Sequence, residues 1–355
     1  MKRLVRIAAL GVLATLLAGC FYWQAIGGQL ELLRKRTPIE KLLADPDVDP
    51  KLKASLASVA EIRRFASEEL ELPDNDSYTS YVDLGRPYVV WNVVATPEFA
   101  VEPKRWCFPF VGCVGYRGFF DREDAEKFAA GLAREGLDTY SGGSTAYSTL
   151  GYFADPVLST MIGGGDQYVA SLLFHELTHQ KLYVKDDSEF SEALATVIEE
   201  YGTERWLASH GTAEALELYR RRLMFRGDFA DLIGVQQARL RVVFAAGGTV
   251  EDKRAAKARA YDAMRADYAV MKARWGGVTD YDAWFASPLN NATLAAVATY
   301  RRWVPAMRAR LDEVGLEAFY EEMTGLSKLS VAERAARLQA WLDALSPAGA
   351  PPQAG

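Results

Sequence analysis

Hydrophobic positions repeat with a helical period along most of the chain. Residues 23–72 form helical segments that are interrupted at Pro38 and again over residues 45–50, where Pro and Asp favour turns. Beyond residue 166 apolar side chains recur every three to four positions, most clearly over residues 211–246 and 332–345. Strand patterns hardly recur there. We therefore expect a C-terminal half that is built from helices.

A different pattern lies between these regions. Residues 88–99, 106–120 and 138–153 are rich in Val, Tyr, Phe and Thr with Gly and Pro between them, which is typical of short strands. Residues 121–136 interrupt them with an amphipathic helix that ends at Gly136. The pattern predicts a predominantly helical α+β fold with a small β-sheet.

One domain over residues 20–345 accounts for this order, since no linker or repeat divides it. We expect N-terminal helices over residues 20–75, the small-sheet region over 76–165, and the remaining helices over 166–345. The composition of residues 346–355, "SPAGAPPQAG", predicts a disordered tail.

The N-terminus has the order of parts of a signal peptide. Lys2, Arg3 and Arg6 precede an apolar run over residues 7–17 that is too short for a membrane span. The run ends in "LAGC", which resembles the lipobox of bacterial lipoproteins, so residues 1–19 would be removed and Cys20 would carry a lipid. The alternative is an uncleaved membrane anchor with an incidental cysteine.

This signal peptide predicts a lipid-anchored protein of the bacterial cell envelope that faces the periplasm. Phe21 follows the cysteine in place of the aspartate of the usual retention signal, which favours the outer membrane. At 355 residues, 50% of them hydrophobic, the chain can bury a sizeable core. A net charge of −6 provides no basic face, so we expect no nucleic-acid partner.

Two cysteines, Cys107 and Cys113, remain after Cys20. In an oxidising compartment an even number favours a disulfide. Two buried thiols are the alternative.

Candidate chemistry is concentrated in "FHELTHQ", residues 174–180. His175 and His179 are two of only three histidines, and on a helix their spacing of four places both on one face, where two imidazoles can bind one Zn²⁺. Glu176 is rotated by about 100°, near enough to reach a metal-bound water without binding the metal. This is the zincin pattern His-Glu-x-x-His. A helix with a hydrogen-bonded histidine and a solvated glutamate is the alternative.

A tetrahedral site needs one more protein ligand. His210 is a weak candidate because it resembles a cation at a helix C-terminus. A turn over residues 185–187 followed by a second helix would form an αα-hairpin whose facing side chains meet at the metal. Four glutamates of that helix compete for the role: Glu189, Glu192, Glu199 and Glu200.

Glu192 and Glu199 share one face of this second helix. Glu192 lies in "FSEALA", which is similar to the Glu-x-x-Ala pattern of the second ligand helix in known zinc aminopeptidases. Glu199 lies 20 residues after His179, a spacing closer to that of thermolysin. Because the hairpin turn is short, we expect Glu192 to be the ligand and Glu199 to orient a ligand histidine.

The chain resembles a known family, the predicted aminopeptidases of bacterial envelope lipoproteins. The resemblance covers most of residues 22–310 and includes "CFPFVGCVGYRGFF", "FHELTHQKLYV" and "FSEALATVIEEYG". It implies a zincin-like metallopeptidase that hydrolyses peptide bonds, with Zn²⁺ on His175, His179 and Glu192. Glu176 is then the general base on a zinc-bound water. The Gly-x-Met-Glu-Asn segment by which related enzymes hold an α-amine is absent, so aminopeptidase and endopeptidase activities both stay open.

Further roles follow as expectations. Tyr147, Tyr152 or Tyr300 could donate a hydrogen bond to the transition state. Residues 146–156 could form an edge strand that pairs with a peptide substrate, and a buried sheet strand followed by a turn at Asp155-Pro156 is the alternative. A lipid-anchored envelope scaffold or adaptor with a structural or inactive zinc site is the alternative function. Substrate identity and oligomeric state stay open.

Overall fold

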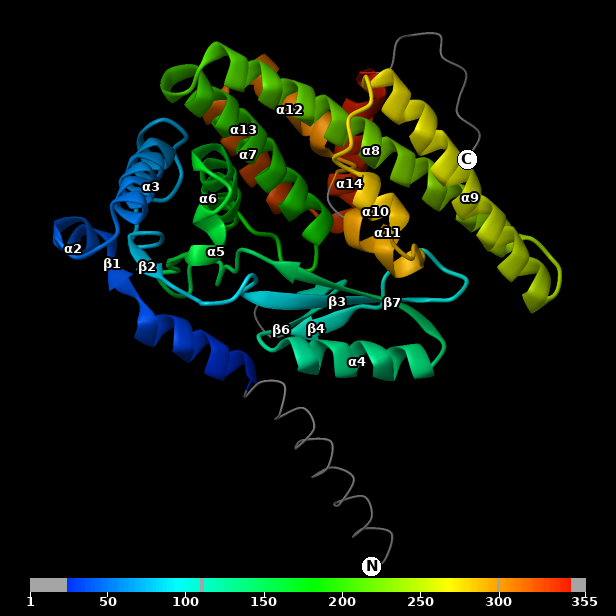
Figure 1. Ribbon diagram of the computed structural model, residues 1–355. Coiled ribbons are helices and arrows are strands. Elements are labelled where there is room, and N and C mark those ends of the chain that lie inside the picture. The colour runs from blue at the N-terminus through cyan, green and yellow to red at the C-terminus, as the bar shows by residue number, and fades with distance from the viewer. Residues whose placement is uncertain (1–23, 109–111, 299–300, 346–355) are drawn as a thin grey trace, which may run out of the picture.

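Figure 1 presents the computed structural model, which describes residues 24–108, 112–298 and 301–345. Helices dominate it and a small sheet region lies beneath them, so the predicted α+β class is confirmed. The signal peptide with Cys20, the tail over residues 346–355, and Tyr300 lie outside the described residues.

The N-terminal helices break where the sequence predicts. Residues 24–35 are helical, β1 (Thr37–Pro38) interrupts them, and α2 (Ile39–Ala44) and α3 (Pro50–Glu68) follow. The side chain of Asp49 accepts hydrogen bonds from the backbone N–H groups of Lys51 and Leu52, which caps α3. Pro50 at the first helical position lacks only an N–H that would have had no partner.

The central strand β3 (Val90–Pro97) pairs antiparallel with β7 (Leu137–Ser144) on one side and β6 (Arg117–Phe119) on the other. Helix α4 (Arg122–Arg134) covers this sheet through a small apolar cluster that includes Val93, Phe119 and Leu132. A second sheet joins β1, β2 (Ser80–Val82) and β8 (Val157–Leu158), while β4 (Trp106–Phe108) and β5 (Gly112–Val114) form a separate ribbon.

The strand expected over residues 146–156 is wrong, because residues 145–156 form a loop that precedes β8. The buried carboxylate of Asp155 accepts hydrogen bonds from the backbone N–H and the hydroxyl of Thr149, both at 2.8 Å, and from the Ser148 hydroxyl at 3.3 Å. These local bonds occupy groups that a strand would pair with a neighbour.

Helices α6 (Asp166–Lys181) and α7 (Ser188–His210) form the predicted αα-hairpin, seen at the centre of the helical layer in Figure 1. Both are buried on most faces, so they occupy the main core. Asp187 caps α7 by accepting from Phe190 N, and its other carboxylate oxygen accepts from Nε of the buried Arg334 at 2.7 Å.

A second group of helices stands beside this hairpin. It consists of α8 (Ala213–Ala245), α9 (Val250–Arg274), α10 (Asp282–Ala286) and α11 (Asn291–Ala298), which share a separate apolar cluster. Helix α11 contacts α8 as well as β3 and β7, so it joins the helices to the sheet. The last helices return to the main core: α12 (Val304–Val314), α13 (Leu316–Ser327) and α14 (Val331–Ala344). Among helices of the described ranges, none is both long and apolar enough to span a bilayer.

Candidate metal centre

Three side chains from the α6–α7 hairpin converge on one point. His175 and His179 project from α6, and Glu192 meets them from the second turn of α7. Oε2 of Glu192 lies 3.2 Å from Nε2 of His175 and 3.6 Å from Nε2 of His179. Ligands of a tetrahedral Zn²⁺ at about 2.0 to 2.1 Å are about 3.3 Å apart. Both distances are close to this value, and the ligand atoms of the three residues all lie within 4.8 Å of one another, so these residues can share one metal ion.

Glu199 lies on the other side of the His175 ring. Its Oε2 is 3.1 Å from Nδ1 of His175, and its Oε1 accepts a hydrogen bond from Nη1 of Arg226 at 3.0 Å. Both oxygens of this carboxylate are thus occupied, which leaves Nε2 of His175 directed at Glu192. Such a carboxylate fixes the tautomer and the orientation of a ligand histidine.

The charges in the cluster support one another. Burial opposes the charged form of His175, but hydrogen bonds with Glu192 and Glu199 raise its pKa well above the usual value. Burial also opposes ionisation of Glu192, yet the adjacent histidines lower its pKa. The cluster therefore keeps Glu192 ionised and favours a proton on His175, which a metal ion would displace, since histidine binds metals in its neutral form.

His179 offers a single nitrogen to the cluster. Its Nε2 faces Glu192, whereas its Nδ1 is buried and has no hydrogen-bond partner among the described residues. The ring of Tyr183 lies edge-on against it, with centroids 5.9 Å apart. Packing thus holds this imidazole, and Nε2 is the atom placed to act as a ligand.

Glu176 follows His175 on α6 and is half-buried. Its carboxylate makes no hydrogen bond or ion pair with the described residues, although it is close enough to Tyr78, Tyr116 and Asp155 to influence their pKa values. Burial, with a smaller effect of Glu176, raises the pKa of Asp155 to about 6. Glu176 therefore provides, beside the metal cluster, a carboxylate that makes no structural hydrogen bond or ion pair with the described residues.

A tyrosine that the sequence analysis missed lies nearer to Glu176 and Glu192 than Tyr147 and Tyr152 do. Tyr116, in the turn between β5 and β6, is near Glu192 and Glu176, and burial together with these charges raises its pKa. Tyr147 neighbours both Tyr116 and Asp155. Tyr152 is 63% exposed on the loop before β8. Nothing in the local pattern around Tyr116 distinguishes it from the other tyrosines.

A disulfide between Cys107 and Cys113 joins β4 to β5, at the base of the turn that carries Tyr116. The backbone N–H of Cys113 donates to the carboxylate of Asp186 at 2.8 Å. Asp186 belongs to the turn between α6 and α7 and has a positive φ of 67°. The bridged ribbon therefore contacts the turn of the helix pair that holds the metal ligands.

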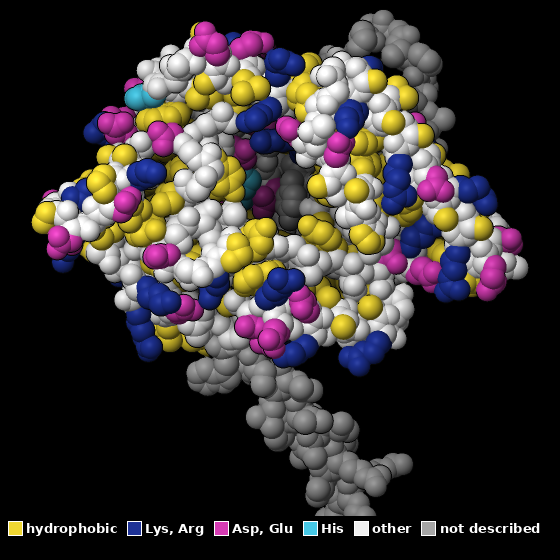
Figure 2. Space-filling model, in the orientation of Figure 1, with side chains coloured by type: hydrophobic (Ala, Val, Ile, Leu, Met, Phe, Trp, Pro, Cys, Tyr) yellow, Lys and Arg dark blue, Asp and Glu magenta, His cyan; other side chains and the backbone are white. Residues whose placement is uncertain are grey.

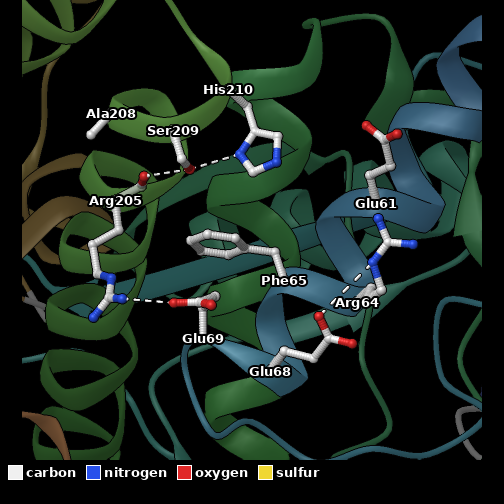
Figure 3. A pocket seen from close by; sticks show the side chains of 9 residues that line it. All are labelled: Glu61, Arg64, Phe65, Glu68, Glu69, Arg205, Ala208, Ser209 and His210. Atoms are coloured by element: carbon white, nitrogen blue, oxygen red, sulfur yellow. Dashed lines mark hydrogen bonds and ion pairs between the residues drawn. The ribbon is translucent and has the colours of Figure 1, made fainter.

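His210 lies elsewhere, at the C-terminal end of α7. Eighteen residues of helix separate it from Glu192, a distance of about 27 Å. Its ring stacks on Trp206 with centroids 3.8 Å apart, and it lines a different surface pocket with Phe65 and Arg205 (Figure 3). Of the other glutamates considered, Glu200 pairs with Arg301 and Glu189 lies 4.0 Å from Arg302. None of these joins the metal cluster.

A cavity of about 370 Å³ opens beside the metal cluster. Figure 2 shows a hollow in this face, between the α6–α7 hairpin and the helices that follow, with histidine and acidic side chains in its depth. The lining includes His175, Glu192 and Glu199 on one side and side chains of α8 and α11 on the other. A substrate in this cavity would lie directly against the candidate ligands.

Comparisons with known proteins bear on this arrangement. No curated protein and no solved structure matches the chain. A family profile described as "Putative aminopeptidase" matches residues 20–338, which include the whole cluster and nearly all of the helical half. The chain therefore belongs to this aminopeptidase family.

Proposed function

We propose that the protein is a zinc-dependent peptidase of the bacterial cell envelope. The observation that carries the proposal is the convergence of two imidazoles and one carboxylate beside Glu176, whose carboxylate has no partner among the described residues. A site that serves only structure is usually closed by four protein ligands. Three ligands next to an open cavity are typical of a catalytic site, and family membership supports peptide bonds as the target.

The donor set favours zinc. Two histidine nitrogens and one carboxylate oxygen suit Zn²⁺, whereas Mg²⁺ and Ca²⁺ prefer oxygen ligands. When bound, the zinc ion would polarise both a water molecule and the scissile carbonyl. His175, His179 and Glu192 would hold it, and Glu199 would keep the His175 ring aligned.

The remaining steps belong to side chains of this protein. Glu176 takes the proton of the attacking water and passes it to the leaving amine, as expected of a carboxylate that has no other partner. Tyr116 donates a hydrogen bond to the carbonyl oxygen as negative charge develops there. We assign this role to Tyr116 rather than to the exposed Tyr152 because Tyr116 is near both Glu176 and Glu192.

We also propose that a lipid on Cys20 anchors the protein in the envelope, with the outer membrane favoured. The order of charged and apolar residues over residues 1–20 supports this. Replacement Cys20→Ser, with the protein followed by membrane fractionation and lipid labelling in a bacterial host, tests the anchor. Unchanged labelling of the variant would contradict it.

Metal content is the direct test of the site. A soluble form that begins at residue 21 should contain about one zinc by mass spectrometry, as one tetrahedral site requires. Glu192→Ala should remove it. A well-folded wild type that stays free of metal after reconstitution with zinc would overturn the peptidase proposal.

Catalysis is tested separately with Glu176→Gln. We expect this variant to keep its zinc and to lose turnover of peptides by about 10² to 10⁴-fold. An envelope phenotype that is insensitive to the substitution would instead support the scaffold alternative. Pairs of peptides with free and acetylated N-termini would then separate aminopeptidase from endopeptidase activity.

A further inference from the structure

Two arginines line the cavity beside the metal cluster. Arg226 projects from α8 and Arg301 lies just before α12, and both line the same cavity as His175 and Glu192. Their side chains are 38% and 20% exposed, respectively. Two guanidinium groups therefore line the same cavity as the candidate metal ligands.

Each guanidinium uses only part of its hydrogen-bonding capacity. Nη1 of Arg226 donates to Glu199 at 3.0 Å, and Nη1 of Arg301 donates to Glu200 at 2.9 Å. The Nε and Nη2 groups of both arginines have no partner among the described residues. Since arginine carries five N–H donors in a planar fork, both can bind a further acceptor without releasing their glutamates.

The rest of the wall is largely apolar. Phe229 and Tyr281 stack with ring centroids 4.3 Å apart, and Ala230, Ala296 and Val297 also line the cavity. An apolar wall lowers the local dielectric constant, which strengthens a charge-assisted hydrogen bond formed there. Asp231 also interacts electrostatically with Arg301, but it is exposed and does not line the cavity.

We propose that this cavity is a carboxylate-binding subsite, through which the peptidase selects peptides that carry a negative charge within about one residue of the scissile bond. The inference rests on the proposed function. The recognised carboxylate can belong to an acidic side chain or to the C-terminus of a short peptide, since both present the same two oxygens to an arginine fork.

Binding of peptide hydroxamates to zinc-reconstituted protein tests the proposal without turnover. Three probes share one sequence, with the zinc-chelating hydroxamate next to the variable residue: Gln with an amidated C-terminus, Glu with an amidated C-terminus, and Gln with a free C-terminus. Calorimetry gives their affinities. We expect at least one carboxylate probe to bind about tenfold or more tightly than the neutral one, which is the scale of one charge-assisted hydrogen bond.

The variants isolate Arg301. Arg301→Gln is combined with Glu200→Gln so that the buried glutamate is not left unpaired. Arg302→Gln is the matched control, because it removes the same charge from the adjacent residue, which is 54% exposed and outside the cavity lining. Arg226 is left intact because it holds Glu199.

The preference for a carboxylate should fall several-fold in the double variant, where only Arg226 remains in the cavity, and should persist unchanged in Arg302→Gln, while the neutral probe binds all three proteins alike. Equal affinity of the three probes for wild type would overturn the subsite and leave the metal site standing. A preference that is undiminished in the double variant would also overturn it. Failure of every hydroxamate to bind zinc-reconstituted protein would overturn the proposed function and this subsite with it.

Discussion

Glu199 holds His175 from the side opposite Glu192. The carboxylate of Glu199 lies 3.1 Å from Nδ1 of the ring, while Glu192 lies 3.2 Å from Nε2. The two glutamates come from one face of α7, seven residues apart, so a single helix supplies both the candidate ligand and the group that orients its neighbour. The two carboxylates should therefore respond differently to substitution.

Glu199→Ala should weaken zinc binding by about 10 to 100-fold, as loss of an orienting partner commonly does. Glu192→Ala should weaken it much further, because a ligand is lost. Competition with a chromophoric chelator measures both. Glu189→Ala, on the same helix but outside the cluster, should bind zinc as wild type does. A larger loss in Glu199→Ala than in Glu192→Ala would exchange the two roles.

Tyr116→Phe should lower kcat by about 10 to 10³-fold with little change in KM, since the phenol is assigned to the transition state alone. Zinc content should not change. Tyr152→Phe is the control, because this side chain is 63% exposed. Equal kinetics for wild type and Tyr116→Phe would remove Tyr116 from the mechanism.

Asp155 should make stability depend on pH. Burial raises its pKa from 3.8 to about 6 in the folded state, so the folded protein binds the extra proton. Protonation of Asp155 contributes ~2 to 3 kcal/mol to the free energy of unfolding below about pH 4. This contribution is lost as the pH rises through about 6. Asp155→Asn removes the ionisable group and therefore this dependence of stability on pH.

Urea unfolding of metal-free wild type and Asp155→Asn between pH 4 and 7 measures the effect. The free energy of unfolding of wild type should fall relative to that of the variant as pH rises. Parallel curves would mean that Asp155 ionises in the folded protein as it does in the unfolded chain.

Removal of the disulfide should destabilise the protein by about 2 kcal/mol, the chain-entropy value for so short a loop. The double variant Cys107→Ser, Cys113→Ser can be compared with wild type by urea unfolding. Zinc affinity should change little, because the ligands belong to α6 and α7. A variant that is as stable as wild type would show that the disulfide does not contribute to the free energy of unfolding.

The parts of the site that the sequence predicted depend on residues that are close together along the chain. A spacing of four places His175 and His179 on one helical face wherever the helix lies. The short turn over residues 185–187 then requires α7 to return along α6, so the approach of Glu192 also follows from neighbouring sequence.

Competition among hydrogen-bond partners within a segment could not be predicted in the same way. The loop over residues 145–156 replaced a predicted strand because a buried carboxylate, 6 residues from Thr149, captured its hydrogen bonds. This outcome depends on which hydrogen-bond partner a backbone group finds, and the period of apolar residues does not record that.

The sequence alone determined the metal-binding pattern, because every element of it lies within one helical hairpin. The tertiary structure decided what surrounds that pattern: Tyr116 comes from a strand turn, Arg226 from α8, and Arg301 from the segment before α12. Segments so far apart meet only when α11 and the sheet pack together. Such packing depends on the shapes of whole surfaces, whereas a helical period is set by neighbours along the chain.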